Sequence, residues 1–179
     1  MQHEFSLTPF SLSDSPQIII QGIANRQRNK FSFSYTVAGN IEEIFFPSLI
    51  TNPTRKDNLW KTTCFEFFMA AKNSPRYWEF NLSPSGEWNA YVMEAYRQVN
   101  MREEVRVQRM QFTVQKDVDC FSLEGELDLS AWITEKTLIE VGIASVIKTN
   151  DGRESFWALT HPQAAADFHL RNNFILEFA

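Results

Sequence analysis

The chain has 179 residues, of which 44% are hydrophobic and 22% are charged, values that are ordinary for a folded globular protein. This length favours one domain, residues 1–179, with a core large enough to form without a metal or disulfides. The net charge of −5 and the lack of a concentrated basic run argue against a nucleic-acid surface. Phe is unusually frequent, with 16 copies, and such aromatic content is typical of β-sheets.

The cysteines and the N-terminal segment bear on the cellular compartment. Cys64 and Cys120 lie far apart in apolar, strand-like segments, so we expect buried free thiols rather than a disulfide framework. The N-terminal sequence MQHEFSLTPFSL lacks the charged and apolar regions of a secretory signal. No segment has the length of a membrane span. We therefore expect a cytoplasmic protein with no membrane partner, and the oligomeric state stays open.

Short runs rich in Ile, Phe, Val, Tyr and Thr recur along the chain between polar, Gly or Pro breaks, which is the pattern of consecutive β-strands. The clearest example is Lys30–Val37, where Phe31, Phe33 and Tyr35 alternate with small polar residues. This alternation is typical of a strand with one buried face. The predicted strands are His3–Leu7, Gln17–Ile23, Lys30–Val37, Ile41–Phe46, Thr62–Ala70, Tyr77–Ser83, Trp88–Tyr96, Val105–Val114, Cys120–Asp128, Leu138–Ile147, Ser155–Thr160 and Phe174–Phe178.

Helical signals are weak. Segments 130–136 and 163–167 are each long enough for one helical turn and too short for a stable amphipathic helix. The sequence contains no repeat, low-complexity tract or linker that would divide it. About a dozen short strands with at most one or two helical turns predict an all-β fold. We expect a two-sheet antiparallel β-sandwich of the immunoglobulin or jelly-roll type.

The segment Leu59–Tyr96 combines large rings with fixed polar groups and is predicted to form three strands joined by tight turns. A first turn centred on residues 73–74 would place Glu66 opposite Asn81, with Glu79 on the same face. The other face, rich in Phe and Leu, would join the core. These pairings predict a polar floor on one side of the sheet.

The third strand of this segment is predicted to complete the floor. A second turn at residues 85–86 would set Trp88 opposite Ser83 and Ala90 opposite Asn81. Trp88 would then stand at one end of the floor, and the small Ala90 would leave room above it. A one-residue error in this register would remove both side chains from the face.

Three stretches of the sequence resemble the DOMON-like relatives of the family-nine carbohydrate-binding modules. They are LWKTTCFEFF at 59–68, YWEFNLSPSGEWNAY at 77–91, and FWALTHP with DFH at 156–169. The resemblance extends from Leu59 to the C-terminus and implies a β-sandwich. It also implies binding of a small saccharide without catalysis. Other members of that group bind haem in redox proteins or have no known ligand.

The resemblance also implies individual roles. In the sugar-binding modules a Trp before this strand stacks on the sugar, and a Glu six positions later bonds its hydroxyls; Trp60 and Glu66 stand at that spacing. The basic residue of the next strand is replaced by Asn81, which donates fewer and weaker hydrogen bonds. A second stacking Trp, in a C-terminal loop, is replaced by Phe168 and His169. The ligand-binding residues that we predict are Trp60, Glu66, Asn81, Trp88, Phe168, His169 and Arg171.

Each of these residues also has a purely structural interpretation. Trp60 can cap the core, and Glu66 can tie down a loop or pair with an Arg. A metal site at His161 and His169 is conceivable, but a seven-residue separation across a loop is unspecific. No Asp-rich loop identifies a calcium site.

Two alternative functions follow. One is a haem-binding electron-transfer domain, since DOMON-type haem sites use Met with His or Lys; the candidates Met69, Met93, Met101 and Met110 are not paired with a His by the sequence. The other is a protein-interaction domain without a small ligand. No catalytic motif is present, and Glu66 with Glu79 is a weak signal for an acid–base pair. We expect a protein that is not an enzyme and needs no cofactor.

Overall fold

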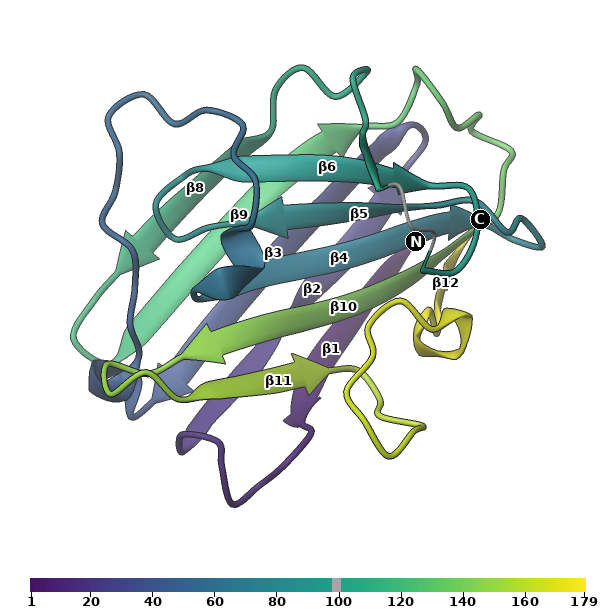
Figure 1. The fold of residues 1–179 in the computed structure, drawn as a ribbon. Helices are drawn as coiled ribbons and strands as arrows, with labels where there is room; N and C mark the ends of the chain where they lie inside the picture. Colours follow the sequence, from purple (N-terminus) through teal and green to yellow (C-terminus); the bar gives the residue numbers. More distant parts are fainter. Residues whose placement is uncertain (98–100) are drawn as a thin grey trace.

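The computed structural model describes residues 1–97 and 101–179 and shows an all-β fold (Figure 1). Three short 3-10 turns interrupt the strands: η1 (Ile41–Glu43), η2 (Leu59–Lys61) and η3 (Arg171–Asn173). The strands are β1 (Gln2–Pro9), β2 (Ile18–Gln27), β3 (Lys30–Gly39), β4 (Cys64–Ala71), β5 (Tyr77–Leu82), β6 (Trp88–Met93), β7 (Arg102–Glu103), β8 (Gln111–Lys116), β9 (Cys120–Asp128), β10 (Ile139–Lys148), β11 (Glu154–Ala158) and β12 (Leu176–Phe178).

The strands form one continuous antiparallel sheet that curls back on itself. Its order is β7-β6-β5-β4-β10-β11-β1-β2-β3-β9-β8, with β12 paired to β10. β1 makes the connection, because residues 2–7 pair with β2 while Thr8 and Pro9 pair with Ala158 and Trp157 of β11. In Figure 1 the strands β4, β5, β6, β10 and β11 cross in front of β1, β2, β3, β8 and β9. The structure therefore shows one curled sheet instead of the two separate sheets that we predicted.

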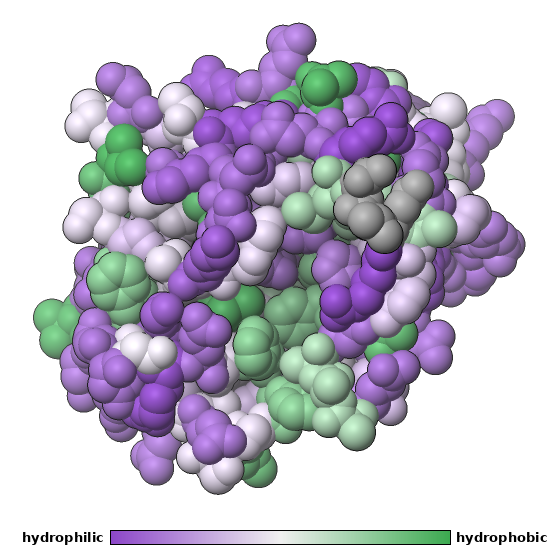
Figure 2. Space-filling view, in the orientation of Figure 1, coloured by the Kyte–Doolittle hydropathy of each residue, from purple (hydrophilic) through white to green (hydrophobic). Residues whose placement is uncertain are grey.

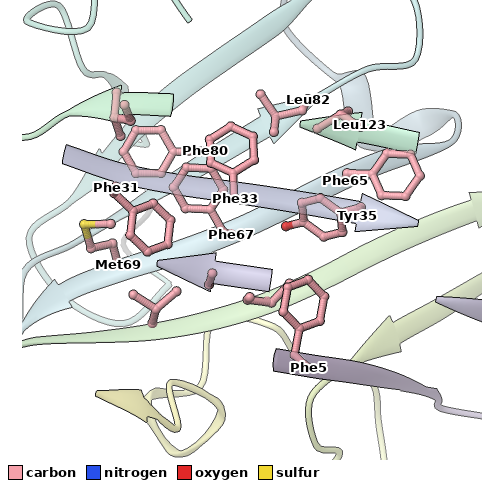
Figure 3. Packing of buried hydrophobic residues seen from close by; sticks show 14 of the residues in the cluster. Phe5, Phe31, Phe33, Tyr35, Phe65, Phe67, Met69, Phe80, Leu82 and Leu123 are labelled. Carbon is pink, nitrogen blue, oxygen red and sulfur yellow. The ribbon is translucent and has the colours of Figure 1, made fainter. Parts of the chain in front are cut away.

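The core lies between the two layers that the curl creates (Figure 3). The predicted alternation in β3 is confirmed: Phe31, Phe33 and Tyr35 are buried on one face. They meet the inward face of β4, where the rings of Phe33 and Phe67 lie 4.9 Å apart. Full burial of one such side chain stabilises a fold by about 1.5–3 kcal/mol. The aromatic content of the chain therefore holds the two layers together.

Two predicted strands differ in the structure. Ile41–Phe46 contains the turn η1 and a single bridge from Ile44 to Thr149 instead of a strand. Val105–Val114 is irregular as far as β8, which begins at Gln111. The carbonyls of Glu104 and Val107 accept hydrogen bonds from the Arg55 guanidinium, so a side chain occupies acceptors that a neighbouring strand would otherwise use.

The predicted helical turns at 130–136 and 163–167 are hydrogen-bonded turns and bends rather than helices. No helix in the described part of the chain is long and apolar enough to cross a bilayer. Cys64 and Cys120 are both free thiols, as predicted, with Cys64 buried and Cys120 partly exposed.

Candidate ligand-binding site

The polar floor that we predicted on β4 and β5 is present. Glu66 pairs with Asn81 and Phe68 pairs with Glu79, so the two carboxylates and the amide share the outward face of the front layer. The inward face carries Phe65, Phe67 and Phe80 in the core. Both carboxylates are almost fully buried, with 3% exposure for Glu66 and 4% for Glu79.

The register predicted for β6 is wrong by one residue. Trp88 pairs with Leu82 and Asn89 pairs with Asn81, because the connection is a three-residue loop in which Gly86 adopts a φ of 89°. The Gly86 amide donates to the Ser83 carbonyl at 2.9 Å and closes this loop. Asn89 therefore faces the polar floor, and Trp88 faces the core.

A cavity of about 350 Å³ lies over the polar floor. Figure 2 shows a hollow in this face in which apolar surface is surrounded by hydrophilic residues. We call it the carboxylate cavity; it is lined by Trp60, Glu66, Glu79, Arg97, Met101, Val146, Phe156, Ala166, Phe168 and His169. Its volume falls at the lower end of the range for small-molecule pockets, about 300–1,000 Å³.

Trp60 reaches the cavity from η2. Asn58 enters this turn in the left-handed region, with a φ of 62°, and Leu59 is buried and anchors the turn. The Trp60 ring then meets the Tyr91 ring edge-to-face at 5.9 Å. The Tyr91 hydroxyl in turn donates to Asp57 Oδ1 at 2.8 Å, which ties the segment before η2 to the sheet.

Several buried oxygens of the floor have no hydrogen-bond partner within the described chain: Glu66 Oε1, Glu79 Oε2 and Asn81 Oδ1. Asn81 Nδ2 donates to the other oxygen of Glu79, Oε1, at 2.8 Å. Buried acceptors without donors are uncommon, and each costs about 1–3 kcal/mol. Two of these three oxygens belong to side chains that line the cavity, so a ligand that donates hydrogen bonds would satisfy them.

Burial changes the protonation of both carboxylates. Desolvation raises the pKa of Glu79 to about 7. It raises the pKa of Glu66 well above its usual value, and the nearby charge of Glu79 adds to this effect. Glu66 and Glu79 together therefore carry less than two full negative charges at neutral pH.

His169 and Arg97 complete the rim of the cavity. Burial and the Arg97 charge lower the pKa of His169 to about 4, so its ring is neutral at physiological pH. His169 Nδ1 shares a hydrogen bond of 2.9 Å with the Tyr77 hydroxyl, while its Nε2 lies 3.9 Å from Glu79 Oε2, beyond hydrogen-bond range. Arg97 is engaged by Asp167, with Nη2 3.0 Å from Oδ1.

The structure brings four of the seven predicted residues to the cavity wall: Trp60, Glu66, Phe168 and His169. Asn81 lies in the floor beneath them. Trp88 is 5% exposed and packs in the core with the Arg55 guanidinium 4.5 Å from its ring centroid. Arg171 is absent from the described wall; it pairs with Glu140 and lies 4.7 Å from the Phe174 ring centroid.

The sequence interpretation did not assign a saccharide-binding role to several wall residues: Glu79, Arg97, Met101, Val146, Phe156 and Ala166. Glu79 was already on the predicted face, and its parity with Asn81 was the available signal. Phe156 alternates with the core residue Trp157 on β11 and so faces outward. Arg97 lies in an irregular segment, where periodicity says nothing about side-chain direction.

A larger and shallower groove, of about 1280 Å³, lies between residues 51–55 and the outer faces of β3, β8 and β9. None of the unpartnered buried polar atoms found in the described chain belongs to its wall. We therefore regard the smaller carboxylate cavity as the functional site. Over residues 1–97 and 101–179, no cluster of three or more His, Cys, Asp or Glu side chains could hold a metal ion.

The comparison with known proteins finds solved structures with a similar fold. No protein-family model matches the sequence, and no curated protein matches it significantly. A candidate carbohydrate-binding protein from Bacteroides uniformis matches 97% of this chain and 84% of its own, with a TM-score of 0.71 and 10% identity.

Two further solved structures are of a family 9 carbohydrate-binding module from Caldicellulosiruptor kristjanssonii. The structure in complex with glucose has a TM-score of 0.56 and 9% identity, and the match covers 85% of this chain and 72% of the module. The structure in complex with cellotriose has a TM-score of 0.51 and 11% identity, covering 85% and 70%. At these identities the comparison shows a shared fold: this chain is built like the family 9 carbohydrate-binding modules.

Proposed function

We propose that this protein binds a small saccharide in the carboxylate cavity. The observation that carries the proposal is the pair of buried acceptors, Glu66 Oε1 and Glu79 Oε2, that have no partner in the described chain and lie beside the rings of Trp60 and Phe168. Saccharide hydroxyls donate hydrogen bonds, and the C–H face of a sugar ring packs on aromatic rings. A single cavity thus offers both kinds of contact that a sugar requires.

The fold comparison supports this proposal from a separate direction. Two of the similar structures are a carbohydrate-binding module in complex with glucose or cellotriose. The motif pair Trp60 and Glu66 that suggested this family in the sequence lies on the wall of one cavity. A closer relationship to DOMON-like proteins remains a proposal that rests on the sequence motifs.

Binding without catalysis fits the carboxylates better than hydrolysis does. A glycosidase needs one carboxyl group that stays ionised and another that keeps its proton. Here burial raises the pKa of Glu66 well above its usual value and that of Glu79 to about 7, so neither carboxyl group is held fully ionised at neutral pH.

A haem site is the second candidate, because Met101 and His169, residue types that ligate haem iron, line the same cavity. The charge of the wall weighs against it, since haem carries anionic propionates and the one described wall residue with a permanent positive charge, Arg97, is engaged by Asp167. Haemin therefore belongs in the ligand panel. A haemin spectrum with axial Met–His ligation that is lost in Met101→Ala would replace the saccharide proposal.

Isothermal titration calorimetry with a panel of mono- and oligosaccharides tests the proposal. We expect saturable binding that weakens at least about tenfold in Trp60→Ala, because the ligand loses its stacking surface; for nucleic-acid bases such stacking is worth about 1–3 kcal/mol. Phe45→Ala, a change at an exposed ring outside the cavity wall, serves as the matched control and should bind normally. Undiminished affinity in a folded Trp60→Ala protein, or no binding of any sugar, would contradict the proposal.

A further inference from the structure

We propose that the carboxylate cavity selects a saccharide that carries a primary amine, with the ligand's ammonium group placed between Glu66 and Glu79. This inference rests on the proposed function and specifies the class of sugar. It follows from the balance of charge and of hydrogen-bond donors around the cavity.

The geometry brings two carboxyl groups to one ligand-sized space. Glu66 pairs with Asn81, and Glu79 is two residues from Asn81 on the same strand. The two carboxylates are therefore diagonal neighbours, with Cβ atoms somewhat less than about 7–8 Å apart. Each has one oxygen without a partner in the described chain, and both side chains line the cavity. An ammonium group has three N–H donors and can serve both oxygens at once.

The surrounding protein does not supply a compensating cation. Of the described wall residues, Arg97 is the one with a permanent positive charge. It is turned to Asp167, with Nε 3.1 Å from Oδ2 and Nη2 3.0 Å from Oδ1. His169 is neutral because burial keeps its pKa at about 4. The described wall therefore offers these carboxyl groups no free cation, and a ligand that carries one would supply the counter-charge for their ionised forms.

Other titratable groups near the pair do not change this balance. Tyr77 on β5 and Tyr91 on β6 stay neutral because burial raises the pKa of both hydroxyls. On β4, burial likewise raises the pKa of the Cys64 thiol. Asp57 and Glu103 accept from the Asn89 amide, and Asp167 neutralises Arg97. Arg55 is a cation at this face, but it donates to Asn89 Oδ1 and to backbone carbonyls and is not part of the described cavity wall.

A neutral sugar satisfies this site less completely. Its hydroxyls can donate to the unpartnered oxygens, but a carboxyl group that keeps its proton then makes only hydrogen bonds between neutral groups, which are weaker than charge-assisted ones. An ammonium group provides donors and counter-charge together, as charge-assisted hydrogen bonds. The rings of Trp60 and Phe168 on the same wall can pack on the sugar and attract the cation. The expected ligand is thus an amino sugar.

The test compares sugars that differ at one substituent. Glucose, galactose and mannose are titrated into the full chain by calorimetry, together with their 2-amino and 2-acetamido counterparts. The three substituents are a hydroxyl, an ammonium and a neutral amide on the same ring. We expect at least one 2-amino sugar to bind about tenfold or more tightly than both of its counterparts.

Charge-removing variants locate the effect. In Glu66→Gln and in Glu79→Gln we expect the ratio of amino-sugar to parent-sugar affinity to fall towards one, with folding checked by near-UV circular dichroism. Glu124→Gln, at an exposed carboxylate on β9, is the control and should keep the ratio. An unchanged ratio in both cavity variants would overturn the inference.

Proton release gives a second readout. Because burial raises the pKa of Glu79 to about 7, this carboxyl group keeps its proton at pH 6, and binding of an ammonium beside it should expel that proton. Calorimetry at about pH 6, below the pKa of the ligand amine, in two buffers of different ionisation enthalpy measures the number released. We expect release with the 2-amino sugar, and its absence would overturn the inference.

The outcomes separate the two proposals. If neutral sugars bind and the 2-amino sugars bind no more tightly, the proposed function stands and the amine inference is overturned. If no sugar of the panel binds to the folded protein, the proposed function itself fails. Cyclohexylamine, an amine without hydroxyls, is included, and binding of this probe without any sugar would overturn both proposals.

Discussion

Glu79 is buried in the polar floor with Oε2 unpartnered in the described chain, and its titration couples folding to pH. Its pKa rises from 4.5 to about 7 on folding, so the folded protein holds the proton more tightly than the unfolded chain. Its contribution to the free energy of unfolding is therefore full below about pH 4.5. This contribution is lost as the pH rises through about 7.

We expect Glu79→Gln to change this pH dependence. The variant cannot ionise, so at pH 8 it should be more stable than the parent by on the order of 2–3 kcal/mol, with each pKa unit corresponding to about 1.4 kcal/mol. At pH 5 the two proteins should be nearly equal. Urea unfolding at both pH values measures the difference, and Glu124→Gln is the exposed control. A variant that is less stable than the parent at pH 8 would contradict this account.

At the residue scale, the sequence predicted the β4–β5 part of the floor and missed the β6 part. The pairing of Glu66 with Asn81 followed from alternation and one turn position. The β6 register depends on whether the loop has two or three residues, and Gly86 in the left-handed region extends it to three. That single residue exchanges Trp88 for Asn89 on the floor.

At the scale of secondary-structure elements, Arg26 joins the end of β2 to two distant segments. Its side chain is 2% exposed. Its guanidinium donates to the carbonyls of Thr134 and Thr137 in the turn before β10, and to Phe178 of β12 at 3.2 Å. Burial lowers its pKa, although Glu135 partly offsets this effect. One side chain thus ties both the turn before β10 and strand β12 to the end of β2.

We expect Arg26→Met to lower the free energy of unfolding by about 3–5 kcal/mol, because the carbonyls of Thr134, Thr137 and Phe178 lose this donor and the turn before β10 loses its link to β2. Arg26→Lys should recover little of this, since a lysine lacks the planar fork that reaches separate acceptors. Guanidinium chloride unfolding measures both changes, and Arg109→Ala, at an exposed residue, is the control. Full stability in Arg26→Lys would show that the charge alone suffices.

Most strands were predictable because their side chains alternate, as in β3, where every second residue is buried. Two predicted strands are absent because other interactions satisfy the backbone there. In the segment after β7, Arg55 takes the carbonyls of Glu104 and Val107, and at Ile41 the chain turns through η1. Apolar content suggested strands at both places, but a distant side chain or a tight turn satisfies the backbone there.

At the scale of the whole molecule, Phe67 lies where the two layers meet. Its ring centroid is 4.9 Å from that of Phe33 and 4.4 Å from that of Phe80. We expect Phe67→Ala to cost about 3–5 kcal/mol, whereas Ile19→Ala on the exposed face of β2 should cost far less. Far-UV and near-UV circular dichroism should follow one common unfolding transition. Separate transitions would show that the layers fold independently.

The all-β class was predictable from the sequence, whereas the continuity of the sheet was not. Alternation and turn residues are local signals, and they identify strands one at a time. The pairing of Thr8 with Ala158 joins segments 150 residues apart, and no local sequence pattern predicts it. The individual strands of both layers were therefore predictable, but their connection into one curled sheet was not.

The position of β1 also has a consequence for synthesis on the ribosome. β1 is made about 150 residues before the β11 strand that it pairs with, and translation proceeds at about 5–20 residues per second. For many seconds the nascent chain holds β1 with one edge unpaired, a state that favours wrong pairings. We therefore expect the sheet to close after β11 has left the ribosome, with chaperones binding the chain until then.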